Sequence, residues 1–404
     1  MKTVHSHSVR WLARSQRGVS TLLISVILFL LASVLLITVS RTTLMEQRMS
    51  ANEIRSRQAF EAAQAGIDQA AVVLISSKVD ADANGVPDAG PNATLAGSGA
   101  RYFVSWCQPG VALPANVCDT IAAPACTAVT TANFNTPLIV SCGWSDDGIG
   151  RKLIQQGIGT VSALGGIPSN PLTAKGGLNV GGSANVVNYY NNLTVWTGGS
   201  LTSVGNSGKT FVRNPTVAPP DPTTPPPGPP NSCSTSTDYV CLTDKNTTGP
   251  DVIGNDPTLF NLTDAQMFTN YFGQPDLATY KAEVAKTVIN ASAVGTLAGK
   301  LGESIVVTGN TTLPNATIGS REQPVVLIID GDLEMQGTPY VYGIVYVTGN
   351  VTGGGNVTVQ GAMVIEGSVT PTGSLDVIYD PLVGTGANNT GRPGLIPGSW
   401  RDWR

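Results

Sequence analysis

The longest run of apolar side chains lies near the start of the chain. Residues 19–40 carry no charge and are flanked by Arg17 and Arg41. At 1.5 Å per residue, a helix of this length spans about 33 Å, enough to cross the hydrocarbon core of a bilayer. Residues 1–18 hold four Lys or Arg residues and no acid, which keeps this leader in the cytoplasm. The pattern predicts a transmembrane segment over residues 19–40, with the rest of the chain exported.

The helical pattern continues beyond this apolar run. From Arg41 to Ser77 there is no proline and a single glycine, Gly66. Apolar or small residues recur mostly three or four positions apart, at Met45, Met49, Phe60, Ala63, Ile67, Ala70 and Leu74. Such spacing is typical of an amphipathic helix. We expect one helix over residues 19–77, whose second half packs against a globular part.

The residues around this helix resemble those of a known family. The basic leader, the apolar segment and the stretches 41–52 and 58–66 look like the N-terminal region of PilX-type minor pilins of type IV pili. The segment 397–403 is similar to the end of the same family. The resemblance implies that a prepilin peptidase cleaves between Gly18 and Val19, and that the new N-terminus is methylated.

The same resemblance implies a location and partners. The subunit would be held in the bacterial inner membrane with its C-terminal region in the periplasm, and would reach the type IV pilus and the cell surface after assembly. Other pilins and minor pilins would contact it through the N-terminal helix. Major pilins carry a glutamate at the fifth mature position, where this chain has Leu23. That departure suits a subunit that initiates or tips the filament. A plain single-pass membrane anchor is the alternative.

An acidic loop follows the predicted helix. Side-chain oxygens at loop positions 1, 3, 5 and 9 come from Asp80, Asp82, Asn84 and Asp88. With Gly85 at position 6, this is the spacing of the first part of an EF-hand loop, which wraps carboxylates around one calcium ion. The glutamate expected at position 12 is replaced by Pro91, so a metal-free turn is the alternative. Calcium, if bound, is expected at these four oxygen-bearing residues.

Six cysteines in an exported chain predict disulfides. They are Cys107, Cys118, Cys126, Cys142, Cys233 and Cys241. We expect a local bridge between Cys233 and Cys241. For the other four, the favoured pairing is Cys107 with Cys142 and Cys118 with Cys126.

Strand patterns surround the first four cysteines. They cover residues 101–107, 137–144 and 150–161, with a hairpin turn between the last two. They predict a small antiparallel sheet that packs on the exported half of the helix. Residues 78–168 would form this cysteine-bearing head.

The strongest regularity is a six-residue glycine period. Glycine recurs at Gly331, Gly337, Gly343, Gly349, Gly355, Gly361, Gly367 and Gly373. The second and fourth residues after each glycine are mostly apolar, and alternation puts them on one face of a short strand. Three hexads make a rung of 18 residues, so we predict a single-chain parallel β-helix over residues 301–381. A right-handed coil is favoured, as in bactofilins, and a flat antiparallel sheet is the alternative.

The rest of the C-terminal region predicts further parts of this domain. Residues 169–204 repeat the pattern weakly and read as its first rungs. Residues 205–300 form an insertion with a proline-rich linker, the Cys233/Cys241 loop and one or two short helices, which would cap an open end of the β-helix. Residues 382–404 are left as a tail. The predicted fold class is α+β and mostly β.

Composition excludes several functions. The two histidines, His5 and His7, both lie in the leader, so no histidine base or His-ligated metal is expected in the mature protein. A net charge of −4 argues against nucleic-acid binding. Together with the family resemblance, which implies a pilus assembly protein, these absences favour a structural role over an enzyme. The β-helix could be presented for adhesion, and a pilus-displayed adhesin is the alternative function.

Overall fold

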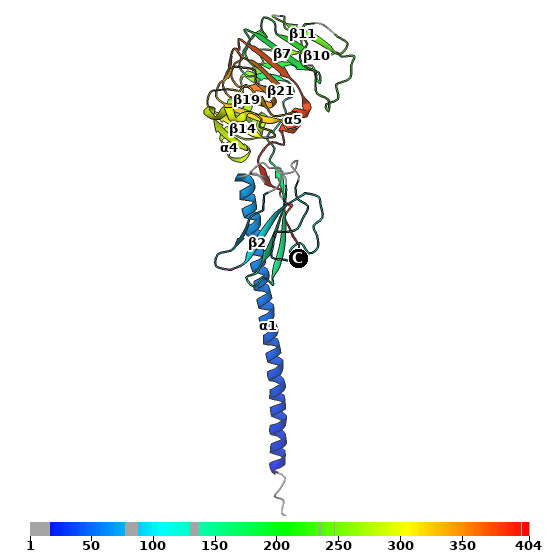
Figure 1. The fold of residues 1–404 in the computed structure, drawn as a ribbon, viewed down its shortest axis with the longest axis vertical. Helices are drawn as coiled ribbons and strands as arrows, with labels where there is room; N and C mark the ends of the chain where they lie inside the picture. The colour runs from blue at the N-terminus through cyan, green and yellow to red at the C-terminus, as the bar shows by residue number, and fades with distance from the viewer. Residues whose placement is uncertain are drawn as a thin grey trace, which may run out of the picture.

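The molecule is elongated and has three parts along its length (Figure 1). The computed structural model describes residues 17–403 except 77–87, 130–136, 234–235, 246 and 397. A single long helix is followed by a small sheet, the head, which lies against the upper part of the helix. A larger β-rich body, called here the β domain, lies beyond the head on the side away from the start of the helix. The long apolar helix and mostly β body agree with the predicted fold class.

Helix α1 (Arg17–Ser76) joins the first two parts. Its second half buries a stripe of small side chains against the head, chiefly Ala59, Ala62, Ala63, Ile67 and Ala70. Two glycines permit the close approach of helix and sheet. A Cβ at Gly143 would stand 2.1 Å from the carbonyl oxygen of Ala59, and one at Gly66 would stand 2.2 Å from Ser141 Oγ. The alanine-rich stripe is therefore a packing surface.

The head is an antiparallel sheet. Its strands run in the order β1 (Asn92–Thr94), β2 (Arg101–Cys107), β3 (Leu138–Trp144) and β4 (Arg151–Thr160). Both segments at the end of the chain, β23 (Pro393–Leu395) and β24 (Arg401–Trp403), pair with β4. Residues 382–404 are thus not the separate tail that was predicted, because the last residues complete the head sheet. The β domain is an insertion between β4 and β23.

The C-terminal half of the β domain is a stack of parallel strands. Its main strands are β14 (Ser304–Thr308), β17 (Val325–Asp330), β19 (Tyr340–Val347), β21 (Asn356–Ile365) and β22 (Ser374–Ile378). Val345 pairs with Met363, and Asn356 pairs with Ser374. Paired residues in β17, β19, β21 and β22 are thus 18 apart, the interval that three hexads predict.

Shorter strands complete each turn of the chain. β15 (Thr311–Thr312), β18 (Leu333–Met335) and β20 (Val351–Gly353) form a sheet of their own, and β16 (Thr317–Ile318) pairs with β19. Inward positions such as Val345, Val347 and Val357 are buried in one continuous apolar core. The outer positions alternate with them, as the period of two along a strand requires.

The earlier strands stack on the end of this repeat and not on its start. They are β5 (Leu172–Ala174), β6 (Leu178–Asn179), β7 (Ser183–Asn188), β8 (Val195–Thr197), β9 (Leu201–Ser203) and β10 (Lys209–Arg213). Leu172 pairs with Met363, and Ser183 with Ser374. Residues 169–204 do supply rungs, but the prediction that they come first was wrong. The insertion carries the chain back to the far end before the glycine repeat begins.

The short helices cover one side of the stack. They are α2 (Pro257–Phe260), α3 (Asp264–Phe272) and α4 (Leu277–Glu283). Phe268, Phe272 and Tyr280 pack against outward residues of the sheet such as Tyr346. The predicted end cap was therefore wrong. The end beside β14 is covered by β13 (Thr287–Asn290) and a 3-10 helix, η2 (Ala291–Leu297), whose last leucine enters the core.

Three further elements close the domain. β11 (Tyr239–Asp244) pairs antiparallel with β10, and β12 (Val252–Ile253) pairs with β8. Helix α5 (Pro381–Ala387) follows the last strand of the repeat. It leads the chain into a narrow neck, where Val161 N–H donates to the Arg392 carbonyl at 2.8 Å. Two segments of the chain therefore connect the β domain to the head.

Candidate functional site

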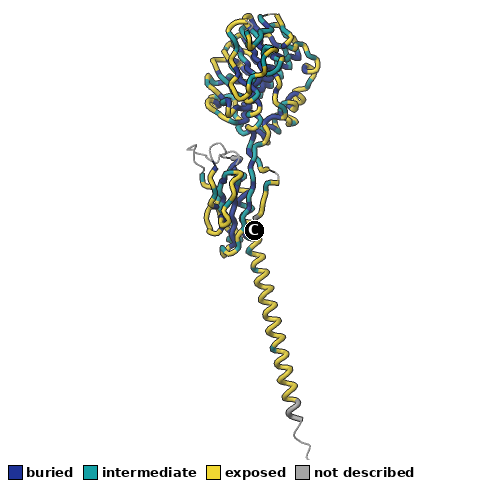
Figure 2. The backbone as a smooth tube through the Cα atoms, turned by 90° about the vertical axis from the view of Figure 1, so that its right-hand side faces the viewer, coloured by how far each residue is buried: buried dark blue, intermediate teal, exposed yellow. Residues whose placement is uncertain are grey.

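The first half of α1 is exposed and apolar. Leu22, Phe29 and Leu36 are each more than 60% exposed, and most of their neighbours are similar. Figure 2 shows this half as a continuous exposed rod below the head. Among the described residues, one helix is long and apolar enough to cross a membrane, and it is α1. Because such a surface is unfavourable in water, this segment requires a membrane or other apolar helices around it.

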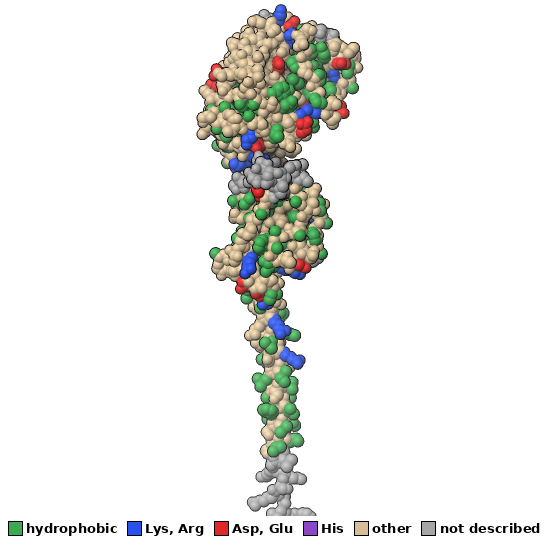
Figure 3. Space-filling model, in the orientation of Figure 1, with side chains coloured by type: hydrophobic (Ala, Val, Ile, Leu, Met, Phe, Trp, Pro, Cys, Tyr) green, Lys and Arg blue, Asp and Glu red, His purple; other side chains and the backbone are tan. Residues whose placement is uncertain are grey.

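Between the apolar run and the head, α1 offers a mixed surface. Leu44, Met45, Met49 and Ile54 are all exposed, and charged side chains lie between them on the helix below the head (Figure 3). Among the described residues, the head first contacts the helix at Arg55 and buries it from Ala59 onward, so most of this stretch lies clear of the head. It is the part of the molecule best suited to pack against helices of other subunits.

An ion pair fixes the lower edge of the head to α1. Arg55 donates from Nε to Asp147 Oδ2 at 2.5 Å. Asp147 lies in the β3–β4 turn and also accepts from Ser145 Oγ and the Ile149 N–H. These hydrogen bonds, with the nearby guanidinium, lower the pKa of Asp147 to about 2. The carboxylate therefore stays charged and holds the turn against the helix at ordinary pH.

The head disulfides differ from the favoured pairing. Cys107 bonds with Cys126, and Cys118 with Cys142. In the β2–β3 register Cys142 faces Phe103, four residues from Cys107. At about 3.3 Å per residue, that offset is about 13 Å, which is too far for a disulfide. Cys233 and Cys241 are bonded to each other, as expected.

The other predicted site residues are those of processing and of calcium binding. Gly18 and Val19 lie in its first turn. Asp80, Asp82 and Asn84 lie outside the described residues, and Asp88 is the first described residue after them. Among the described residues no cluster of three His, Cys, Asp or Glu side chains could hold a metal ion. The structure therefore leaves the calcium prediction untested.

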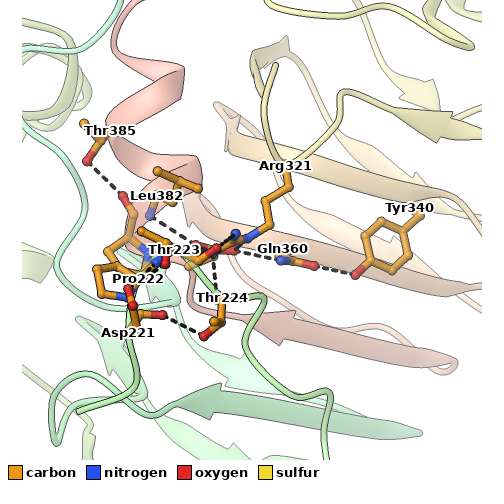
Figure 4. Close-up of polar contacts among 11 residues, drawn as sticks. Asp221, Pro222, Thr223, Thr224, Arg321, Tyr340, Gln360, Leu382 and Thr385 are labelled. Atoms are coloured by element: carbon orange, nitrogen blue, oxygen red, sulfur yellow. Dashed lines mark hydrogen bonds and ion pairs between the residues drawn. The ribbon is translucent and has the colours of Figure 1, made fainter.

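The β domain contains a buried polar network that the sequence did not reveal (Figure 4). Arg321 is 8% exposed, and its Nε donates to Asp380 Oδ2 at 2.7 Å. Its other nitrogens donate to three successive carbonyls, those of Pro222, Thr223 and Thr224. The proline-rich segment, predicted as an extended linker, is thus tied to the β domain through residues 222–224.

The network extends from Asp380 to the sheet. Gln360 donates from Nε2 to Asp380 Oδ2 and accepts from the Tyr340 hydroxyl, each at 2.8 Å. Asp380 also accepts from the Leu382 N–H at the start of α5. One buried carboxylate therefore holds together the strand stack, the proline-rich segment and α5.

A second carboxyl, Glu366, lies beside the outward residues that the short helices cover. Glu366 accepts from the Tyr346 hydroxyl at 2.5 Å. Burial raises its pKa to about 7, and the nearby charges of Asp264 and Asp330 add to this, while the Tyr346 hydrogen bond and Lys175 oppose it. Lys175 pairs with Asp264, and Lys281 of α4 pairs with Asp330. These pairs join helices α3 and α4 to the sheet.

The arrangement of the lower two parts defines the class of protein. A long helix that is apolar and exposed over its first half, and covered by a small antiparallel sheet over its second, fits a pilin fold. Residues 17–68 match the family model described as PilX N-terminal. The N-terminal region is therefore similar to that of PilX-type minor pilins of type IV pili, as the sequence resemblance implied.

Other comparisons add less. Residues 284–374 match a model described as a domain of unknown function (DUF8470). Among solved structures, the chain is weakly similar to the competence-associated pilin ComZ from Thermus thermophilus. That match has 12% identity and a TM-score of 0.22 and covers 86% of this chain and 98% of the other, and so low a score does not establish a shared fold. A search of the curated proteins finds no match.

Proposed function

We propose that this minor pilin initiates or tips the type IV pilus. The observation that carries the proposal is the position of the β domain, which extends the molecule beyond the head and away from the apolar half of α1 (Figure 1). A subunit within the filament has further subunits above its head, in the space that this domain fills. The molecule fits best where no subunit lies above it, at the tip.

The N-terminal residues support the same role. Leu23 stands where the resemblance places a glutamate in major pilins, and that carboxylate would neutralise the N-terminus of the neighbouring subunit. A subunit that is first in the filament has no need of this contact. Its partners are then the pilins that join below it through α1. The role is structural and not catalytic.

The life cycle of the subunit follows from the leader. A prepilin peptidase removes residues 1–18 at Gly18–Val19, and the inner membrane holds the mature protein by residues 19–40. The region beyond Arg41 lies in the periplasm until assembly carries it to the cell surface. Calcium binding at Asp80, Asp82, Asn84 and Asp88 belongs to the proposal as well.

For the β domain we propose a right-handed parallel β-helix. The 18-residue offset between paired strands and the single continuous core support this reading. A right-handed path is the usual hand when a connection joins two parallel strands of one sheet. The domain lies farthest from the apolar half of α1 (Figure 1), which suits a role in adhesion.

Immunogold labelling of pili with antibody against the β domain tests the tip position. We expect label at filament ends, and fewer filaments of ordinary length in a strain that lacks the protein. Label spaced along the shafts would contradict the tip position. Normal filament number in the deletion strain would contradict initiation.

A further inference from the structure

A row of polar side chains crosses six neighbouring strands of the β domain. Strand register aligns one outward residue from each strand in turn: Lys209, Asn185, Asp376, Thr358, Tyr340 and Thr317. We call these six residues the polar row. With strands about 4.8 Å apart, the row is about 24 Å long. The strands that carry it lie side by side in the upper body of Figure 1.

The row faces outward because the residues beside it face the core. Val186, Val377, Val359 and Val341 alternate with its members and are buried inside the stack. Thr317 is exposed, and the other five members are half-buried. The row is therefore recessed, yet it remains open to a ligand.

Tyr340 supplies an aromatic surface that is held in place. Its ring lies 4.7 Å from that of Tyr342, centroid to centroid, on the same side of β19. Its hydroxyl donates to Gln360, which the buried Asp380 holds in turn. Because the ring is fixed before any ligand arrives, binding against it costs little conformational entropy.

The centre of the row has unused hydrogen-bonding capacity. Asn185 Nδ2 donates to Asp376 Oδ1 at 2.8 Å. Asn185 Oδ1 is buried and has no hydrogen-bond partner among the described residues. That oxygen has no exposed surface, so the row offers a ligand only the partly exposed portions of Asn185 and Asp376. Asp376 is partly buried as well, which raises its pKa.

The chemistry of the row selects the kind of ligand. It carries one carboxyl, Asp376, and one ammonium, Lys209, so it is close to neutral overall. The backbone N–H and C=O groups along the row are hydrogen-bonded to neighbouring strands, so a ligand can bind only to side chains. An extended peptide would find no free strand edge there to pair with. Hydroxyl, amide and carboxyl groups beside a tyrosine face match a molecule that has many hydroxyls and apolar C–H faces.

We propose that the polar row binds a neutral polysaccharide, laid across the strands with sugar rings against Tyr340 and hydroxyls on Asn185, Asp376 and Thr358. The proposal deepens the adhesion role suggested above and rests on it for its biological setting. Binding itself requires only the folded β domain. A failure of tip location and a failure of glycan binding can therefore be told apart.

The test uses the full chain purified in detergent and immobilised for surface plasmon resonance. Three neutral polysaccharides, hydroxyethyl cellulose, galactomannan and dextran, are passed over it, with polygalacturonate and heparin as anionic polymers. Tyr340→Ala removes the ring, and Thr358→Arg obstructs the middle of the row without removing a packed side chain. Thr352→Ala, an exposed change on β20 away from the row, is the matched control. Melting curves establish that each variant is folded.

We expect at least one neutral polysaccharide to bind. Tyr340→Ala or Thr358→Arg should weaken it about tenfold, the change expected for loss of one good aromatic or polar contact, and Thr352→Ala should leave it within about twofold. The proposal is overturned if no neutral polysaccharide binds, or if only the anionic polymers bind. Binding that survives Thr358→Arg in the folded variant also overturns it.

Discussion

At the scale of single residues, Arg321 has the largest expected effect on stability. Its guanidinium is buried against Asp380, whose side chain is fully buried. Replacement by methionine keeps much of the volume but leaves Asp380 as an uncompensated buried charge. We expect Arg321→Met to lower the free energy of unfolding by about 3–5 kcal/mol, measured by denaturant unfolding.

An exposed ion pair provides the control for Arg321. Arg151 and Asp119 lie 2.9 Å apart with both side chains about half exposed. Arg151→Met should therefore cost less than about 1 kcal/mol. If both variants lose the same small amount, Arg321 does not hold the domain together.

Glu366 predicts a pH dependence of stability. Its pKa is about 7 in the fold against an ordinary value of 4.5, chiefly because of burial. Between these two values the folded state holds a proton that the unfolded state has released, so stability falls as pH rises from 4.5 to 7 and then levels off. Glu366→Gln should remove this slope and raise stability above pH 7 by about 1–2 kcal/mol, a figure reduced for partial exposure. Melting temperatures from pH 4 to 9 would show it, and an unchanged slope would contradict it.

Substitution of Gly18 is expected to block processing of the leader. It joins the basic leader to the apolar start of the helix, and a glutamate there would place a charge and a long side chain at the proposed cleavage point. Gly18→Glu should leave an uncleaved precursor in the membrane. Mass spectrometry of the wild-type protein should find a mature N-terminus at Val19, and any other start would refute the site.

A ladder of polar side chains along the repeat is visible in the sequence. A polar residue follows every third glycine of the repeat, at Asn310, Asp332, Asn350 and Ser368. The side-chain oxygens of the first three accept from the backbone N–H of the equivalent residue one turn later. This ladder holds successive turns together at a corner. Its spacing of 18 or more residues could be found in the sequence, whereas the contacts of Arg321 could not, since they join residues 59 to 99 positions apart with no repeat to mark them.

At the scale of elements, strand positions were predictable and their partners were not. The strands at 101–107 and 137–144 lie where the alternation placed them. Their register depends on packing against α1, so the Cys107–Cys142 pairing could not be tested from sequence. Likewise, helices α3 and α4 were expected at an end of the stack. They cover a side instead, because Tyr346 and its outward neighbours form an apolar surface there.

The alternation within the repeat predicts two opposite outcomes for one substitution. Val357 is 2% exposed in the core of the stack, and no Lys or Arg lies between Glu322 and Asp380 in the sequence. Val357→Asp should lower the free energy of unfolding by several kcal/mol, because the buried carboxylate has no partner. The exposed Thr352 should accept aspartate within about 0.5 kcal/mol. Equal losses in denaturant unfolding would mean that the two faces are not distinguished.

At the scale of the whole molecule, the head is built from two stretches of sequence that are separated by the β domain. After the β domain is complete, β23 and β24 return to the head and pair with β4. From the order of the sequence alone, the last residues were predicted to form a tail. The antiparallel pairing with β4 shows that they belong to the second part of the molecule.

This insertion predicts that the β domain can be removed without loss of the head. At the neck, Ala163 N–H donates to the Asn388 carbonyl at 2.8 Å, so a short glycine-serine turn can replace residues 164–387. The excised protein should still form the Cys107–Cys126 and Cys118–Cys142 disulfides, detected by mass spectrometry, and should resist proteolysis over the head.

The matched control for the excision is truncation after Asn388, which keeps the β domain but removes β23 and β24. It should expose the edge of β4 and uncover the side chains that the last strands protect, among them Gln156, whose Nε2 donates to Ser399 Oγ at 2.7 Å. The truncated head should therefore be degraded although it retains more of the chain. If the excised protein is degraded and the truncated one survives, the last residues are not part of the head, and the β domain supports the pilin fold instead of being carried by it.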